Sequence, residues 1–169
     1  MAKRRKPHEQ PVQKALRFLV RFNLFAIPLY AIMLSGAALP ALMHLTQALA
    51  FGGLHVIGVP ASVSGGFIAV PVSGGNFAAT VSSDSTGWKS MLALLALIFA
   101  TDFALDKKLK GLLLLLVIYA LNVTRIIFIF YAVHAWGIEY FAALHETLWS
   151  LGMILAVLAL WYFWIKRVK

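Results

Sequence analysis

Long apolar segments are the feature that most limits how this chain can fold. Four of them approach the roughly 20 residues that a helix needs to cross a bilayer, and they cover residues 22–39, 88–105, 111–132 and 140–165. Hydrophobic residues make up 62% of the 169 positions, whereas soluble domains contain about 45–50%. The sequence therefore predicts one integral membrane domain over residues 1–169, an all-α multi-pass bundle with at least four transmembrane helices.

Basic residues indicate how these helices are oriented. Thirteen of the fifteen lysines and arginines flank apolar segments. They are Lys3, Arg4, Arg5, Lys6, Lys14, Arg17, Arg21, Lys107, Lys108, Lys110, Lys166, Arg167 and Lys169. Because Lys and Arg are enriched on cytoplasmic flanks, we expect both termini in the cytoplasm, with residues 1–21 as a basic cytoplasmic N-terminus. Basic clusters beside a membrane commonly meet anionic lipid, so we expect no nucleic-acid partner.

The region between the first two spans has a different character. Residues 40–60 are too short and too polar for a span, which predicts an outer-face or partly embedded helix. In residues 63–83, two runs containing Val, Ile, Phe and Thr flank Ser73-Gly74-Gly75-Asn76, a hairpin signature with glycine at the turn. Strands cannot lie unpaired in lipid, so we expect residues 63–87 to form a small extracytoplasmic β-hairpin cap leading into Ser85.

Two basic residues, Lys89 and Arg125, remain inside or at the edge of spans, where an ionisable group is costly and indicates a functional site. Arg125 lies 14 residues past Gly111, which is about 21 Å along an outward-running helix. Ser85 and Lys89 lie at the outer end of the second span, and His145 near the outer start of the last. We therefore expect a hydroxyl, a guanidinium and an imidazole from separate helices to meet beneath the outer surface.

Most of these residues also have a purely structural interpretation. Each of Ser82, Ser83, Asp84 and Ser85 could cap a helix. Lys89 could snorkel toward water or, one turn from Ser85, serve as the base of a Ser/Lys hydrolytic pair. Asn122 and Arg125 share one helix face, where they could clamp two helices together or bind an oxyanion, a carboxylate or a phosphate.

His145 and Glu146 begin a pattern that is half of a zinc-protease motif. The complete motif needs a second histidine at position 149, which is Trp149, so we expect no metal. His145 could then be an interfacial residue or a general acid and base. The chain has no cysteine, which excludes thiolate ligands, and we expect no cofactor.

The other charged and imidazole side chains receive no functional assignment. A local ion pair beside Lys107 near the inner face explains Asp102 and Asp106. The histidines that lack a comparable setting are His44, His55 and His134.

Taken together, the motifs resemble those of the exosortase/archaeosortase family of membrane-embedded protein-sorting transpeptidases. A strand-rich outer stretch precedes a motif that opens a span, a basic loop follows, then N-x-x-R-I in the next span and a histidine near the start of the last. The motifs read Ser85-Thr86-Gly87-Trp88-Lys89-Ser90, Asn122-Val123-Thr124-Arg125-Ile126 and His145-Glu146, within residues 63–160. The residues of the first motif and the short length of the chain are closer to the archaeal branch of this family.

The resemblance implies a nucleophilic cysteine at the position of Ser85, an arginine at Arg125 and, in exosortases, a histidine at His145. The positions expected to bind substrate or support the site are Asp84, Thr86, Gly87, Lys89, Asn122 and Glu146. It also implies substrates whose C-terminal tails carry a short motif, a transmembrane helix and a basic cluster. Such tails are cleaved near the outer membrane surface, and the new carboxyl end passes to an acceptor such as a membrane lipid.

Ser85 is the position at which this chain departs from the family pattern. Serine is a weaker nucleophile than cysteine and needs an activating base. An engineered inactivating substitution, a natural serine enzyme and a non-catalytic relative all stay open, and the retained neighbouring pattern favours the first. The rival functions are a transporter or channel component whose Lys89, Arg125 and His145 line a polar path, a Ser/Lys membrane hydrolase, and an assembly scaffold.

Overall fold

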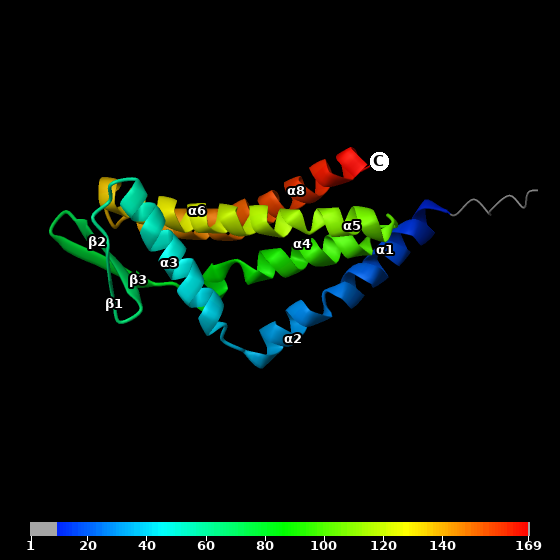
Figure 1. The fold of residues 1–169 in the computed structure, drawn as a ribbon, viewed down its shortest axis with the longest axis horizontal. Helices are drawn as coiled ribbons and strands as arrows, with labels where there is room; N and C mark the ends of the chain where they lie inside the picture. Colours follow the sequence, from blue (N-terminus) through cyan, green and yellow to red (C-terminus); the bar gives the residue numbers. More distant parts are fainter. Residues whose placement is uncertain (1–9, 169) are drawn as a thin grey trace, which may run out of the picture.

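The computed structural model describes residues 10–168, without the side chains of residues 148–150, and it is mostly helical with one small sheet (Figure 1). In chain order the elements are α1 (Pro11–Phe25), α2 (Ile27–Ser35), α3 (Pro40–Val56), β1 (Ser62–Ser64), β2 (Phe67–Val72), β3 (Gly75–Thr80), the 3-10 helix η1 (Ser83–Thr86), α4 (Trp88–Ala100), α5 (Leu105–Gly111), α6 (Leu113–Trp136), α7 (Tyr140–Glu146), the π-helical segment η2 (Thr147–Gly152) and α8 (Met153–Val168). The basic positions that lie outside the described residues are Lys3, Arg4, Arg5, Lys6 and Lys169.

Helices α1, α4, α6 and α8 form an elongated bundle (Figure 1). α4 is central to it, because α1, α6 and α8 all pack against α4, and α6 also contacts α8. The core between α4, α6 and α8 is apolar. Its buried members include Leu94, Ile98, Ile118, Val157 and Trp164.

A second core lies at the end of α6 that is farther from α5. There the three-stranded antiparallel sheet, in the order β1-β2-β3, packs with α3 against α6. Ile68 and Val70 of β2 and Phe77 of β3 are buried together with Ile126 and Phe130 of α6. Alternate residues of a strand point to opposite faces, so one face of the sheet supplies this core while the other stays exposed.

Two contacts fix α3 and the sheet against α6. Gly53 lets α3 approach closely, since a Cβ at this position would collide with the side chain of Ile127. His134 of α6 lies 2.6 Å through Nδ1 from the carbonyl oxygen of Pro71 in β2. No role could be assigned to His134 from the sequence, because its partner is a backbone oxygen distant in the chain.

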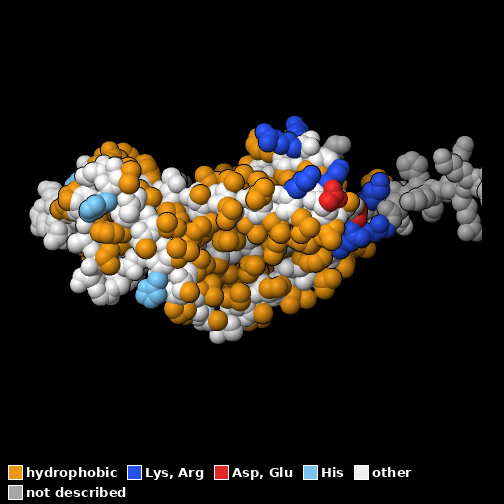
Figure 2. Space-filling view, in the orientation of Figure 1, with side chains coloured by type: hydrophobic (Ala, Val, Ile, Leu, Met, Phe, Trp, Pro, Cys, Tyr) orange, Lys and Arg blue, Asp and Glu red, His pale blue; other side chains and the backbone are white. Residues whose placement is uncertain are grey.

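Basic side chains gather at the end of the bundle away from the sheet. Figure 2 shows them where α1 begins, α5 lies and α8 ends, with hydrophobic side chains covering the middle of the molecule. Arg21 of α1 forms an ion pair with Asp102 just after α4, and Lys107 of α5 donates to the carbonyl oxygen of Val168 at 2.7 Å. The prediction that Lys107 pairs with Asp102 is therefore wrong, because the packing of α1 on α4 brings Arg21 to that carboxylate.

The structure gives fewer candidate spans than the sequence predicted. Among the described residues, Leu105–Trp136 is long and apolar enough to cross a bilayer, and it contains the predicted span 111–132. α1 and α2 qualify only if they are counted as one span bent by 43°. The bend lies within the predicted span 22–39, where the ring of Pro28 removes a backbone donor and disfavours a continuous helix.

The other two predicted spans are shortened or divided. α4 supplies 13 residues of the span 88–105, because Thr101 has an extended backbone and its hydroxyl donates to the carbonyl of Ile98 at 2.7 Å. The span 140–165 is divided into α7, the π-helical segment and α8. By length and hydropathy, the described residues give one or two candidate spans rather than four.

The predicted hairpin corresponds to β2 and β3, which pair from Phe67↔Thr80 to Val72↔Gly75. The cap is nevertheless a three-stranded sheet rather than a single hairpin, because β1 adds a short strand. Gly65 and Gly66 both have positive φ and form the additional turn. Residues 40–60 contain a helix, as expected, and this helix is α3.

Candidate functional site

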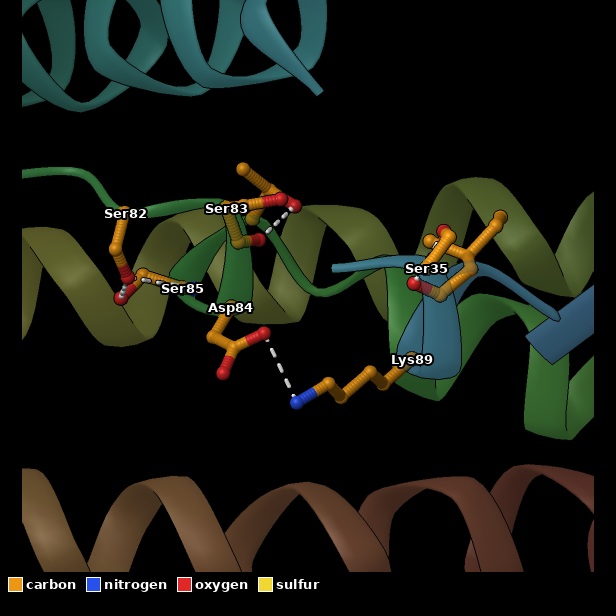
Figure 3. Close-up of polar contacts among 8 residues, drawn as sticks. Ser35, Ser82, Ser83, Asp84, Ser85 and Lys89 are labelled. Atoms are coloured by element: carbon orange, nitrogen blue, oxygen red, sulfur yellow. Dashed lines mark hydrogen bonds and ion pairs between the residues drawn. The ribbon is translucent and has the colours of Figure 1, made fainter. Parts of the chain in front are cut away.

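The site is built on the short η1 helix between the sheet and α4. Ser82 has an extended backbone and caps η1, since its hydroxyl accepts from the amide of Ser85 at 3.3 Å. The two hydroxyl oxygens lie 3.0 Å apart, as the dashed line in Figure 3 shows. Of the four residues that the sequence indicates as possible caps, the structure uses Ser82 rather than Ser83, Asp84 or Ser85.

Gly87 separates η1 from α4 and lets both approach α6. Its φ is +82°, in the left-handed region that favours glycine. A Cβ at this position would lie 2.8 Å from Cγ of Asn122. Thr86 is fully buried, and its hydroxyl donates to the carbonyl of Ser83 at 2.7 Å. The turn is thereby fixed in a form that only a residue without a side chain fits easily.

Asn122 and Arg125 hold η1 from the side of α6. The Asn122 amide donates to the carbonyl oxygen of Ser85 at 2.9 Å, and Nη2 of Arg125 lies 3.5 Å from the same oxygen. Both side chains are buried, with exposures of 1% and 7%. Residues three positions apart lie on the same face of a helix, which explains why both reach one acceptor.

The Arg125 guanidinium is only partly satisfied. Its Nε and Nη1 are buried and have no hydrogen-bond partner within the described residues. An unpaired buried donor costs about 1–3 kcal/mol, and more when the group is charged. This arginine is therefore a strong donor with unused capacity, which is an arrangement that suits an anionic or carbonyl oxygen from another molecule.

Ser85, Arg125 and His145 line one cavity of about 50 Å³. The other residues that line it are Ala79, Thr80, Val81, Ile126, Ile129, Phe130 and Phe141. Ser85 comes from η1, Arg125 from α6 and His145 from α7, and the ring of His145 stacks on Phe141 at 5.3 Å. The structure thus brings together the three groups that the sequence places at one depth, while their catalytic roles stay a prediction.

Lys89 and Asp84 lie on the other side of Arg125. Nζ of Lys89 is 2.9 Å from Oδ1 of Asp84, and Figure 3 shows the two side chains pointing toward each other. With Gly87, Asn122 and Arg125, they line a second cavity of about 290 Å³. The expected helical alignment of Lys89 with Ser85 does not apply, because Gly87 interrupts the helix between them.

Glu146 is the last residue of α7, and its side chain is exposed. The π-helical turn that follows widens the backbone between α7 and α8, and such turns are frequent at functional sites. Among the described residues, no group of three or more His, Cys, Asp and Glu side chains is arranged to hold a metal ion.

The family model described as "Transmembrane exosortase" matches residues 9–163. The chain belongs to the transmembrane exosortase family. It is therefore a membrane protein of a family of cysteine transpeptidases, whose substrates carry PEP-CTERM-like sorting signals. No curated protein and no solved structure matches it. This exosortase-family chain contains no cysteine, and Ser85 as the counterpart of the family's nucleophile stays a prediction.

Sequence reasoning missed part of this candidate site. Ser82 was among the predicted caps, and its position three residues before Ser85 suits that role. Phe141 and the wall formed by residues 79–81 gave no such signal, since an aromatic residue in an apolar segment and an exposed strand end are common everywhere. Only the packing of the sheet and α7 on α6 brings them to the cavity.

Proposed function

We propose that this chain is built as a protease–transpeptidase of the outer membrane face, which cleaves the C-terminal sorting signals of surface proteins and transfers them to an acceptor. The observation that carries the proposal is the cavity shared by Ser85, Arg125 and His145. A nucleophile position, a fixed cation and a titratable imidazole around one small space are the groups that acyl transfer requires.

The proposed reaction begins at position 85, where the serine oxygen, or the sulfur of a cysteine in its place, bonds to the substrate carbonyl carbon. The proton of this nucleophile passes to His145, and the unsatisfied Arg125 donors stabilise the negative carbonyl oxygen. When the C–N bond breaks, His145 returns the proton to the departing amine. The acceptor's nucleophile then gives its proton to His145 and bonds to the acyl carbon. The bond between this carbon and position 85 breaks, and His145 returns the proton to the oxygen or sulfur at position 85.

Asn122 acts in this scheme as a positioning residue. Its amide holds the carbonyl of Ser85 at 2.9 Å, so it fixes the turn that presents the hydroxyl. The paired side chains of Asp84 and Lys89 line the second cavity, which Arg125 also lines. We assign both residues to substrate orientation, together with Gly87, whose missing side chain lets η1 rest on α6.

We further propose four membrane passes: the bent pair α1–α2, then α4, α6 and the run from α7 to α8. Both termini would be cytoplasmic, and the sheet and η1 would face outward. The basic end in Figure 2, opposite to the sheet, supports this orientation. α4 has 13 residues and is about 20 Å long, shorter than the hydrocarbon core of about 30 Å, so Ser85 would lie beneath the outer surface.

A lateral groove supports an approach from within the bilayer. An apolar cavity of about 360 Å³ lies between α1–α2, α4 and α8. Lys89 and Ser90 line both this cavity and the one that reaches Arg125. We propose that the membrane helix of the substrate packs on this side of the bundle, with its basic cluster in the cytoplasm.

Two rivals are less well supported. A transporter needs a polar route through both leaflets, whereas the core between α4, α6 and α8 is a cluster of apolar side chains. A Ser/Lys hydrolase needs the lysine amine directed at the serine hydroxyl, whereas Nζ of Lys89 lies 2.9 Å from Oδ1 of Asp84.

Reconstituted processing tests the proposal. The chain and its Ser85→Cys variant are each co-expressed with a reporter that ends in the tail of a co-encoded surface protein, with its short motif, apolar helix and basic cluster. We expect Ser85→Cys to shorten the reporter, because thiolate is the better nucleophile. Ser85→Ala is the matched control and should leave the reporter intact. If a folded Ser85→Cys protein processes no such tail, catalysis at position 85 is wrong.

A further inference from the structure

The outer edge of β3 is open. Within residues 10–168, the sheet order is β1-β2-β3, so β3 pairs with β2 on one side and with no strand on the other. Asn76, Ala78 and Thr80 are exposed. An exposed strand edge presents unpaired N–H and C=O groups, which form a template for another extended chain.

Pro71 determines which backbone groups of β3 point to this open edge. In an antiparallel pair, hydrogen-bonded and non-hydrogen-bonded residue pairs alternate. Pro71 pairs with Asn76 and has no N–H to donate, so this pair belongs to the non-hydrogen-bonded set. The pairs of Ala78 and Thr80 belong to the same set, and their N–H and C=O groups therefore point away from β2.

The open edge leads into the cavity of the candidate site. Ala79, Thr80 and Val81 line that cavity together with Ser85. Because alternate side chains of a strand point to opposite faces, a run of consecutive lining residues indicates that the cavity meets the strand at its edge. Donors and acceptors of Ala78 and Thr80 thus form a row that ends beside the hydroxyl of Ser85 and the unsatisfied guanidinium of Arg125.

We propose that the polypeptide segment cleaved at this site binds as an additional β-strand on the open edge of β3. This inference rests on the proposed function for the identity of the peptide. An extended segment pairing with Ala78 and Thr80 would place its next carbonyl in the cavity, because residues in a strand advance by about 3.3 Å. Main-chain pairing gives affinity that does not depend on side chains, while alternate side chains supply specificity.

Disulfide crosslinking tests the pairing without requiring catalysis. The chain has no cysteine, so Ala78→Cys provides a single thiol on the strand. The probe is the reporter described above, with single cysteines placed one at a time through the motif before its membrane helix. We expect crosslinks at alternate reporter positions, since only side chains on the same face of neighbouring strands approach within about 5.5 Å. Crosslinks at consecutive positions, or none, would overturn the proposal.

Proline substitutions give a second readout with a matched control. Thr80→Pro removes a donor that points to the open edge and leaves the ladder to β2 intact. Val63→Pro does the same at the opposite edge. The Ser64↔Phe67 pair closes the turn between β1 and β2 and is hydrogen-bonded, so the adjacent Val63 belongs to a non-hydrogen-bonded pair and its N–H points away from β2. Loss of one backbone hydrogen bond is expected to lower crosslinking from position 78 about tenfold in Thr80→Pro, with no change in Val63→Pro.

The two proposals fail in different ways. Crosslinks at alternate positions with no processing by Ser85→Cys would support the strand pairing and contradict the catalytic role. Processing by Ser85→Cys that is equal in the Thr80→Pro and Val63→Pro backgrounds would support the catalytic role and overturn the pairing. Circular dichroism and gel filtration in detergent confirm that each proline variant is folded before it is compared.

Discussion

The two ends of the bundle bury different chemistry. Toward α5, the core is formed by side chains such as Ile98 and Ile118, which are fully buried and apolar. Toward the sheet, the same helix α6 buries Asn122 and Arg125 against the backbone of Ser85. Apolar burial stabilises a fold, whereas burying a charge that is not fully paired costs free energy. The contrast indicates that one end maintains the bundle and that the other keeps a costly group available for a ligand.

Replacing Arg125 should give the largest effect on activity. In the Ser85→Cys background, we expect Arg125→Met to lower the rate of reporter processing about 10²–10³-fold, as loss of one oxyanion donor does in other enzymes. The melting temperature in detergent should stay level or rise, because a buried and incompletely paired charge is removed. Arg167→Met, at an exposed arginine near the end of α8, is the matched control and should process normally.

The same variant separates the proposed function from the scaffold alternative. If Arg125 only clamps η1 to α6, Arg125→Met should lower the melting temperature, and any loss of processing should follow the loss of folded protein. That outcome would remove the difference between the two ends of the bundle, since both would then serve stability alone.

Much of this contrast could be read from the sequence. Arg125 and His145 were identifiable because an ionisable residue in an apolar segment costs free energy and therefore indicates a functional site. The helical rise per residue gives its depth. The sequence could not reveal that Gly87 interrupts the helix, which redirects Lys89 to Asp84. It also could not place the strand end at residues 79–81 beside Ser85, because that contact depends on how the sheet packs on α6.

The span boundaries failed for a related reason. An apolar window measures hydrophobicity, not the continuity of backbone hydrogen bonds. Pro28 bends the first predicted span, Thr101 ends the second early, and the π-helical turn at Thr147–Gly152 divides the last. Each is a local backbone event inside a segment whose average composition hardly changes.

Gly87→Ala should give an intermediate effect at the polar end. The added Cβ would lie 2.8 Å from Asn122, at a φ of +82°, so we expect η1 to move away from α6. The cost should be about 1–3 kcal/mol of unfolding free energy. Gly74→Ala is a matched control, because Gly74 has a φ of +87° and nothing lies within 4 Å of its added Cβ. Chemical denaturation in detergent measures both.

The difference between these two glycine variants isolates the collision from the backbone strain. Processing in the Ser85→Cys background should fall in Gly87→Ala and persist in Gly74→Ala. Equal losses of stability and of processing would mean that close contact between η1 and Asn122 is unimportant for the site.

Ile118→Val should give the smallest effect and should act at the apolar end alone. Ile118 is fully buried in the cluster between α4, α6 and α8, and removing one buried methylene typically costs about 0.5–1.5 kcal/mol. Ile27→Val, at an exposed isoleucine of α2, should cost less. The rate of processing per folded molecule should be unchanged in both, because neither side chain lines the cavity of Ser85. A selective fall in that rate for Ile118→Val would mean that the apolar core positions the polar site. The inference that one end of α6 serves stability and the other serves the site would then be wrong.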